Sequence, residues 1–135
     1  MKIDLHIHTR SCSDGSLSIE DVFQEAKKRH IDLMSTTDHD SIDCQEKAIV
    51  LASEQGISYI TGVELNVTFP YGGKAVSLDF LGYRYDIRNQ ELKSKLRLMR
   101  QHREKRARQI LEKLNAEFDK ENIPRFTAED IRNIE

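Results

Sequence analysis

The sequence has few cysteines and no long apolar run. Its two cysteines, Cys12 and Cys44, cannot form the disulfide framework of a small secreted domain, and neither belongs to a CxxC pair. We therefore expect both thiols to be reduced. No apolar run approaches the roughly 18 residues of a membrane span, and the N-terminus lacks the pattern of a secretory signal. These absences favour a cytoplasmic protein with no membrane partner.

The length limits the fold. A chain of 135 residues holds one domain, or one domain and a fragment. It is too short for a complete eight-stranded α/β barrel of roughly 250 residues. The apolar share of 38% and the charged share of 33% nevertheless permit a real core. We find no internal repeat and no low-complexity segment.

The net charge of -2 argues against a protein that coats nucleic acid, but the charge is unevenly spread. Residues 1–88 hold 9 Lys and Arg against 14 Asp and Glu, a net charge of -5. Residues 89–135 hold 12 against 9, a net charge of +3. The two parts therefore differ in kind, and we expect a domain at 1–88 followed by a separate segment at 89–135.

The first part alternates strands and helices. Residues 2–8 alternate strictly between apolar and polar side chains, which predicts a strand with His6 and His8 on its polar face. Ser18 is expected to cap a helix that ends near residue 30, followed by a strand at 31–37. Ser41 or Asp43 is expected to cap a second helix that stops at residue 56.

A third strand is expected at 58–63, followed directly by Glu64 and then by a hairpin. The hairpin strands would be residues 65–69 and 75–83, joined by a turn at 70–73. The β-α-β-α-β order predicts an α/β fold with parallel strands and right-handed crossovers. After residue 89, an apolar stripe predicts a long helix that packs along one side. Thr127 with Asp130 is expected to begin one more helix.

Potential metal ligands follow each predicted parallel strand. His6, His8 and Asp14 lie at or after the end of the first strand, Asp38 and His39 after the second, and Glu64 after the third. The carboxyl ends of parallel strands are where α/β folds gather ligands and catalytic groups. Each residue could instead be an ordinary turn, cap or surface residue. Their shared placement favours a metal site.

The chemistry of these ligands suggests which ions would bind. Imidazoles and carboxylates without thiolates suit Zn²⁺, Mn²⁺ or Fe²⁺ and disfavour a closed structural zinc site. These candidate ligands exceed in number what one catalytic ion needs, so we expect two ions that share Glu64 as a bridge. Such a pair lowers the pKa of a bridging water toward about 7 and stabilises the transition state of phosphate ester hydrolysis.

Three segments, DLHIHTRSCSDG, TTDHDS and GVE, closely resemble the PHP (polymerase and histidinol phosphatase) family, especially its stand-alone phosphoesterases. The resemblance covers residues 1–88. It implies the N-terminal part of a distorted (β/α)7 TIM-like barrel with two or three divalent metal ions. It also implies hydrolysis of phosphate esters, of the nucleotide or short oligonucleotide type, by a metal-bound hydroxide.

The resemblance assigns roles to residues. It makes His6, His8 and Glu64 ligands of one ion, and Asp14 and His39 ligands of a second ion bridged by Glu64. Asp38 becomes a carboxylate that supports the ligands without binding an ion. Family members often carry a histidine where Asp79 stands, so Asp79 is a weaker candidate for a third metal position.

The chain ends before the further His and Asp ligands that the family supplies from its C-terminal half. Residues 89–135 resemble the first part of a helical insertion domain. Arg10 is a candidate phosphate-binding residue near the expected site, although it could be a plain surface cation. The stretch 93–113 holds nine Lys and Arg against two Glu, and could attract a phosphorylated substrate or simply be a solvated face.

Two classes of function remain open. The first is a metal-dependent phosphoesterase acting on a phosphorylated small molecule or nucleotide. The second is a metal-binding or interaction fragment that needs a second chain or the missing half for activity. An incomplete barrel exposes strand edges, which favours a homodimer or a larger oligomer. A third interpretation, a module of a DNA polymerase, has no polymerase sequence in these residues to support it.

Overall fold

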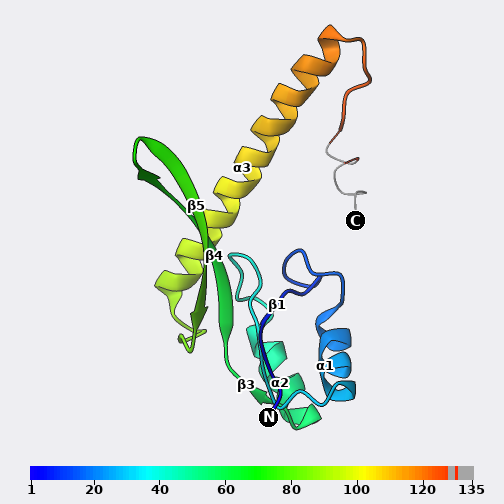
Figure 1. Cartoon of the computed structure of the whole chain (residues 1–135), viewed down its shortest axis with the longest axis vertical. Coiled ribbons are helices and arrows are strands. Elements are labelled where there is room, and N and C mark those ends of the chain that lie inside the picture. Colours follow the sequence, from blue (N-terminus) through cyan, green and yellow to red (C-terminus); the bar gives the residue numbers. More distant parts are fainter. Residues whose placement is uncertain (128–129, 131–135) are drawn as a thin grey trace. The chain divides into compact units, whose positions relative to one another are not determined.

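The structure is a computed structural model that describes residues 1–127 and 130. The chain divides into two compact units, Met1–Arg97 and Leu98–Glu135, and each is described by itself. The elements shown in Figure 1 are, in chain order, β1 (Ile3–Ile7), α1 (Ile19–Lys28), β2 (Leu33–Thr36), α2 (Gln45–Gln55), β3 (Ser58–Tyr59), β4 (Gly62–Tyr71), β5 (Lys74–Tyr83) and α3 (Gln90–Lys120).

The first three strands form one parallel sheet in the order β1-β2-β3. This arrangement confirms the parallel strands expected from the alternation of strands and helices. The other two strands form a separate antiparallel hairpin that is paired along its whole length, from Gly62 with Tyr83 to Tyr71 with Lys74. The described residues thus form a mixed α/β fold, with a three-stranded and a two-stranded sheet.

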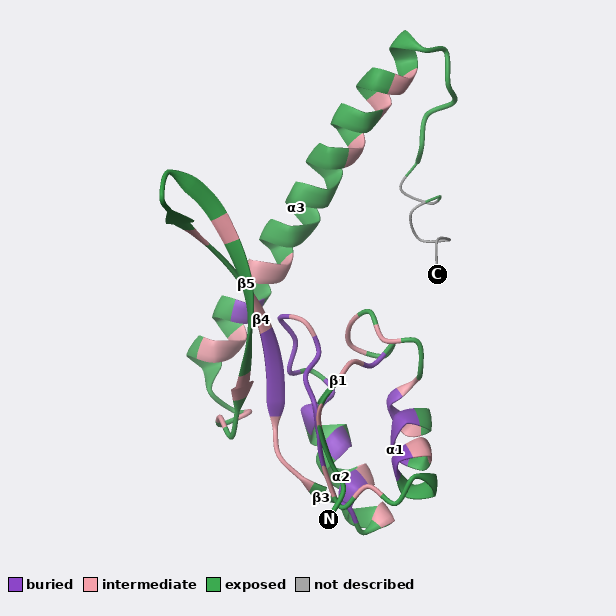
Figure 2. Cartoon of the chain, viewed as in Figure 1, coloured by how far each residue is buried: buried purple, intermediate pink, exposed green. Residues whose placement is uncertain are grey.

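Helix α1 begins as the sequence predicts. Ser18 Oγ accepts a hydrogen bond from the Asp21 backbone N–H, and Asp21 in turn accepts one from the Ser18 hydroxyl. This reciprocal cap satisfies groups that would otherwise be unpaired at the helix start. The apolar face of α1 is buried, as the purple stripe in Figure 2 shows. It packs in one core cluster whose buried members are Ile19, Val22, Phe23, Ala26, Met34, Cys44, Ala48, Ala52 and Ile57.

Helix α2 begins differently from the prediction. Neither Ser41 nor Asp43 is its cap, because the N-cap residue is Cys44 and it makes no side-chain capping bond. Ser41 is 1% exposed and lies within the segment that leads to the helix, so its position is set by packing rather than by capping. The predicted helix end is confirmed, since Gly56 closes α2 in the left-handed conformation at φ 68°.

The expected third strand is divided. Only Ser58 and Tyr59 pair with β2, and the chain re-enters a strand at Gly62 with β5 as its new partner. Glu64 therefore lies on β4, beyond the end of the three-stranded sheet. The hairpin turn is also shorter than expected, because Pro70 and Tyr71 still belong to β4 and the turn consists of Gly72 and Gly73 at positive φ.

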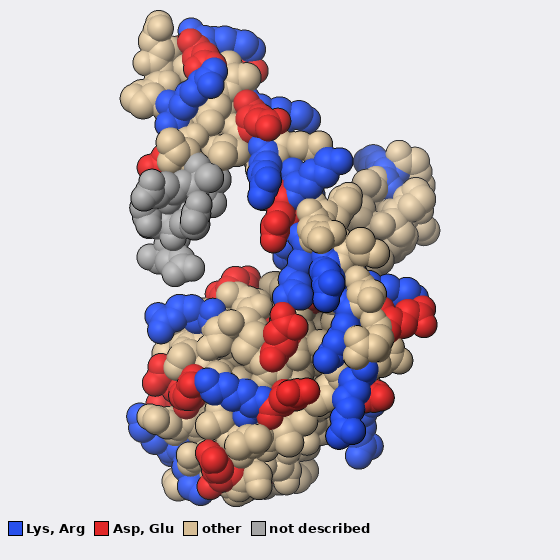
Figure 3. All heavy atoms as spheres, turned by 180° about the vertical axis from the view of Figure 1, so that it is seen from behind, with Lys and Arg blue, Asp and Glu red and all other residues tan. Residues whose placement is uncertain are grey.

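Helix α3 is confirmed, but its apolar stripe is mostly uncovered. Leu96 is the buried residue of α3, whereas Ile110 and Leu114 are exposed, so the predicted packing of the stripe is wrong for most of its length. Lys and Arg side chains follow this helix on the face in view in Figure 3, with carboxylates between them. No helix within residues 1–127 combines the length and apolarity that crossing a membrane requires.

The end of the chain is described only in part. Phe118 and Phe126 contact each other at 5.6 Å between ring centroids, and Asn115 exchanges two hydrogen bonds with the backbone of Phe126. Thr127 and Asp130 exchange the hydrogen bonds expected at a helix start. The rest of the helix predicted after Thr127 falls outside the described residues.

Candidate metal centre

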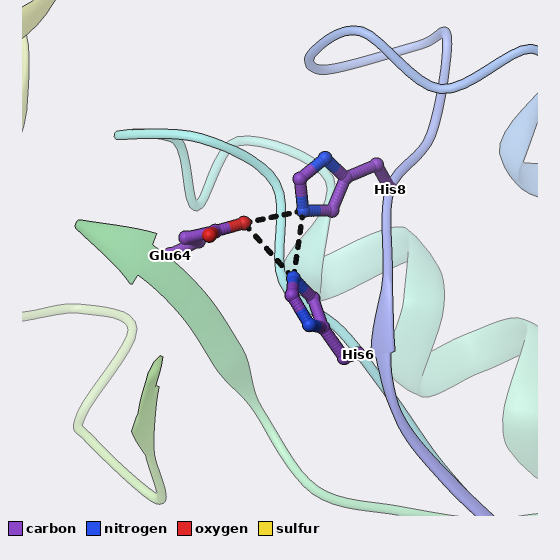
Figure 4. Close-up of side chains that lie close together, drawn as sticks. All are labelled: His6, His8 and Glu64. Atoms are coloured by element: carbon purple, nitrogen blue, oxygen red, sulfur yellow. Dashed lines mark hydrogen bonds and ion pairs between the residues drawn. The ribbon is translucent and has the colours of Figure 1, made fainter. Parts of the chain in front are cut away.

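His6 and His8 bring two imidazole rings to the same face of β1. The alternation of side chains along a strand directs both rings the same way, and the Nε2 atoms of the two rings lie 3.2 Å apart. Figure 4 shows that both nitrogens face the carboxylate of Glu64. Glu64 Oε2 lies 3.0 Å from His6 Nε2 and 2.6 Å from His8 Nε2. Three ligand atoms from two strands therefore converge on one point.

Backbone pairing places Glu64 at this point. The Glu64 N–H donates to the Asp38 carbonyl at 3.3 Å, and the Glu64 carbonyl accepts from the Asp40 N–H at 2.8 Å. These two bonds form an isolated parallel bridge between His39 and Glu64, which joins the start of β4 to the loop after β2. Glu64 is only 5% exposed, so an unpaired charge there would be costly. The two imidazoles supply its partners.

Asp14 and His39 form a second group around His8. Asp14 Oδ1 lies 2.7 Å from His8 Nδ1, and its other oxygen lies 3.7 Å from His39 Nε2. An ionised carboxylate only accepts hydrogen bonds, so each contact calls for a proton on the His8 nitrogen that makes it, Nδ1 toward Asp14 and Nε2 toward Glu64. His8 thus belongs to both groups, through a different nitrogen in each.

The other nitrogen of His39 supports the same interpretation. His39 Nδ1 is buried, has no hydrogen-bond partner among the described residues, and lies 3.7 Å from Glu64 Oε2. A buried polar atom without a partner is unusual in a folded protein. A divalent cation between these groups would satisfy it. The donors present, imidazole nitrogens and carboxylate oxygens, are the ones that Zn²⁺, Mn²⁺ and Fe²⁺ accept.

Neighbouring charges shift the pKa values of His8 and Asp14, which face each other in this centre. Burial lowers the pKa of His8, but the hydrogen bonds and charges of Asp14 and Glu64 outweigh that effect and raise it overall. Burial likewise opposes ionisation of Asp14, yet the bond from His8 and the nearby histidines hold the pKa of Asp14 below its ordinary value. The centre is therefore electronegative and favours a cation.

Asp38 makes hydrogen bonds that hold the loop that follows β1, next to the candidate ligands. Its carboxylate accepts hydrogen bonds from the Thr9 N–H at 2.7 Å, the Thr9 hydroxyl at 3.0 Å and the Ser13 hydroxyl at 2.9 Å. Asp38 is 1% exposed, and this burial raises its pKa despite those bonds. Ser13 also donates to Asp14 at 3.2 Å, so the network reaches a candidate ligand.

Two predicted site residues do not join these groups. Asp79 pairs with Asn66, whose side-chain amide donates to it at 2.7 Å. It shares the hairpin face of Glu64 but lies two residue pairs further along, about 6.6 Å away along the strand. Arg10 is exposed in the loop after β1, where its backbone N–H donates to the Leu17 carbonyl.

Sequence reasoning missed several residues around the centre. Thr9 and Ser13 secure Asp38. Their signals in the sequence are that Thr9 directly follows His8 and that Ser13 directly precedes Asp14. Tyr83 donates from its hydroxyl to the Leu5 carbonyl at 2.7 Å, which ties β5 to β1. Burial and the charge of Glu64 raise the pKa of Tyr83, so its hydroxyl stays protonated beside the centre.

The prediction of two reduced thiols is wrong in this structure. Cys12 and Cys44 form a disulfide with a Cα–Cα distance of 6.1 Å across 32 positions of sequence. Cys44 belongs to the buried core cluster, and Cys12 packs against that cluster from the loop after β1. The tertiary fold brings them into range, and neither the number of cysteines nor their spacing could reveal this.

Comparison with known proteins identifies relatives of the chain. It is 32% identical over 123 residues to a 5'-3' exoribonuclease of Haemophilus influenzae, covering 91% of this chain and 42% of that protein. It is 36% identical over 114 residues to a 3',5'-nucleoside bisphosphate phosphatase of Chromobacterium violaceum, covering 84% of this chain and 38% of that protein. The chain thus spans about two fifths of the length of these relatives.

Solved structures and a family model agree with these relatives. The fold is similar to the crystal structure of a proposed metal-dependent phosphoesterase from Bifidobacterium adolescentis, with a TM-score of 0.74, 25% identity and coverage of 84% of this chain and 38% of that one. The model of the PHP domain matches residues 4–120. The family resemblance is therefore confirmed, and the chain belongs to the PHP domain family.

Proposed function

We propose that this chain is part of a metal-dependent phosphoesterase that hydrolyses phosphate esters of nucleotides or short oligonucleotides. The convergence of His6, His8 and Glu64 within 3.2 Å of one another carries the proposal, because such a group suits a divalent cation. The named activities of the relatives, a bisphosphate phosphatase and an exoribonuclease, support this substrate class.

Each residue has a proposed role. His6, His8 and Glu64 would hold one ion, Asp14 and His39 a second, and Glu64 would contribute to both. Asp79 is the candidate for a third position. When bound, the ions would activate a water molecule as nucleophile and neutralise charge on the phosphoryl oxygens. Arg10 would contribute positive charge toward the substrate phosphate from the adjacent loop.

The remaining residues would act by positioning. Asp14 accepts from His8 Nδ1 and thereby keeps Nε2 turned toward Glu64, as hydrogen-bonded partners of metal-binding histidines do. Asp38 would fix the loop that carries Asp14, through Thr9 and Ser13. In this proposal, Asp38 orients the ligands and does not contact the substrate.

We further propose that residues 1–88 form the beginning of a distorted (β/α)7 barrel and that 89–135 begin an inserted helical domain. The basic stretch of α3 would then attract the anionic substrate. The exposed apolar side chains of the hairpin, among them Val67, Leu78 and Phe80, favour association with another chain or with further barrel strands.

A second candidate function is a metal-binding fragment that is inactive until it is completed. The chain's coverage of 38–42% of its relatives favours it, since the remaining residues of those proteins have no counterpart here. In this case the isolated chain would bind ions but release no phosphate from any ester.

Metal analysis combined with an activity panel tests both candidates. Elemental analysis of protein purified without added metal should show bound ions, and His8→Ala should lose at least one ion per chain. Asp79→Asn is the matched control and should retain the ions of the two main groups. Unchanged metal content in His8→Ala would contradict the assignment. Phosphate release with Mn²⁺ or Zn²⁺ would support the enzyme, whereas metal binding without release would support the fragment.

A further inference from the structure

The disulfide joins the two loops that carry candidate ligands. Cys12 lies two residues before Asp14 in the loop after β1, and Cys44 lies five residues after His39 at the start of α2. These are the only two cysteines in the chain, so each has a single partner within the molecule. The bond closes a loop with a sequence separation of 32 that contains Asp14, α1, β2 and His39.

Hydrogen bonds connect the disulfide to the centre. The Cys12 N–H donates to Thr9 Oγ1 at 3.2 Å, and the Thr9 hydroxyl donates to Asp38. On the other side of Cys12, Ser13 donates to Asp38 and to Asp14. One ligand atom each from Cys12, Asp38 and Cys44 also lies within 4.8 Å of the others. A change in the bond between the cysteines would therefore be transmitted to Asp14.

The two cysteine residues differ in burial. Cys44 is 9% exposed and belongs to the core cluster, whereas Cys12 is half-buried and packs against that cluster from the loop. A small thiol would reach Cys12 Sγ first. Its thiolate would form a mixed disulfide with Cys12 while Cys44 leaves as the thiolate and takes up a proton. A second small thiol would then attack the mixed disulfide and release Cys12 as a thiol. In total, two small thiols are oxidised to one small disulfide, and the protein gains two electrons and two protons.

We propose that the Cys12–Cys44 pair is a redox-sensitive modification site, exchanging with small cellular thiols, that sets the affinity of the centre for its divalent cation. In the disulfide form, the loop holding Asp14 is tied to the segment after His39, and the ligands are held together. In the dithiol form, hydrogen bonds alone hold that loop, among them those to Asp38 and the bond from the Arg10 N–H to the Leu17 carbonyl. Reduction therefore loosens the Asp14 and His39 group and weakens metal binding. This inference rests on the proposed metal-dependent function.

The test compares both redox forms of the same chain, so that no variant needs to fold. One sample is oxidised with glutathione disulfide, the other is reduced with a phosphine, and both are desalted without air. Alkylation with iodoacetamide and mass measurement should show no adduct on the first and two on the second. Calorimetric titration with Mn²⁺ should give a dissociation constant roughly tenfold larger for the reduced form. This is the size of effect seen when groups that orient metal ligands are lost.

The control is the double variant Cys12→Ser, Cys44→Ser, whose Mn²⁺ affinity should not respond to either treatment. Two alkylated cysteines after oxidation would overturn the inference, because the disulfide would not form. Equal Mn²⁺ affinity of the two forms would also overturn it and would leave the proposed metal centre intact. Absence of Mn²⁺ binding in both forms would instead contradict the proposed function, and the redox inference with it.

Discussion

The Nε2 atom of His8 lies 2.6 Å from Oε2 of Glu64. This contact joins the residue that follows β1 to the start of β4. Glu64 is almost fully buried and also contacts His6, at a separation of 58 positions in sequence. A buried carboxylate between two imidazole nitrogens is stable either with a protonated histidine or with a cation among them. The PHP family membership favours a cation as that partner.

Glu64→Gln keeps the size of the side chain and removes its charge. We expect the variant to remain folded, because the backbone bridge to Asp38 and Asp40 does not involve the side chain. Its Mn²⁺ affinity should fall by roughly tenfold or more, since it loses the carboxylate that we propose as the bridging ligand. Calorimetric titration measures the affinity, and circular dichroism checks the fold. Glu54→Gln, on the exposed side of α2, is the control and should bind like the parent chain.

The raised pKa of His8 predicts a pH dependence in the metal-free protein. Asp14 and Glu64 stabilise the protonated ring, so the stability that His8 contributes is present below its ordinary pKa of 6.5. That contribution is lost as pH rises through the higher pKa of the folded protein. Titration followed by NMR should show the His8 pKa falling in Asp14→Asn, because the charged hydrogen-bond partner of His8 Nδ1 is removed. An identical titration in parent and variant would show that Asp14 does not act on His8.

The same titration predicts how metal binding responds to pH. A cation needs the unprotonated Nε2 of His8, so protons compete with it at pH values below the raised pKa. We expect Mn²⁺ affinity to fall by about tenfold for each pH unit in that range, as one proton is displaced per ion. Calorimetry at several pH values measures this slope. A flat profile between pH 8 and pH 5 would exclude His8 as a ligand.

Thr9→Val removes a hydroxyl from the buried network around Asp38. Thr9 is fully buried, and its hydroxyl lies 3.0 Å and 3.1 Å from the two carboxylate oxygens. Loss of a hydrogen bond to a buried charged group should lower the free energy of unfolding by about 1.5–3 kcal/mol. Urea denaturation measures this change. Thr9→Ser keeps the hydroxyl and should recover most of the stability, whereas equal losses in both variants would show that the methyl group matters instead.

Gly62→Ala tests the close approach that begins β4. A Cβ atom at this position would overlap Ser35 Oγ and lie 2.9 Å from the Thr36 carbonyl oxygen. We expect a loss of about 1–3 kcal/mol in the free energy of unfolding, together with weaker Mn²⁺ binding because Glu64 is displaced. At Gly82 on the paired strand, a Cβ atom would meet Val63 Cγ1 at 3.4 Å, an acceptable contact. Gly82→Ala should therefore leave both measurements nearly unchanged.

The local pattern of the sequence was sufficient for the elements that depend on near neighbours. Strict alternation at residues 3–7 predicts β1, and the Ser18–Asp21 pair predicts the start of α1, since both rest on contacts a few residues apart. The same locality explains why Gly56 marks the end of α2. The hairpin is also predictable, although the predicted turn begins two residues early because Pro70 and Tyr71 remain paired within β4.

Other features depended on long-range contacts, and the sequence could not determine them. The expected third strand is divided because its pairing partner changes from β2 to β5. The composition of the segment is apolar and branched on both sides of the division, so it does not reveal the change. The packing of α3 and the Cys12–Cys44 bond likewise depend on which surfaces meet. The sequence by itself determined the types of the candidate ligands and their order along the chain, because neither depends on tertiary contacts. Only the tertiary structure decided that Glu64 faces both imidazoles, because that contact exists only once β4 returns beside the loop after β2.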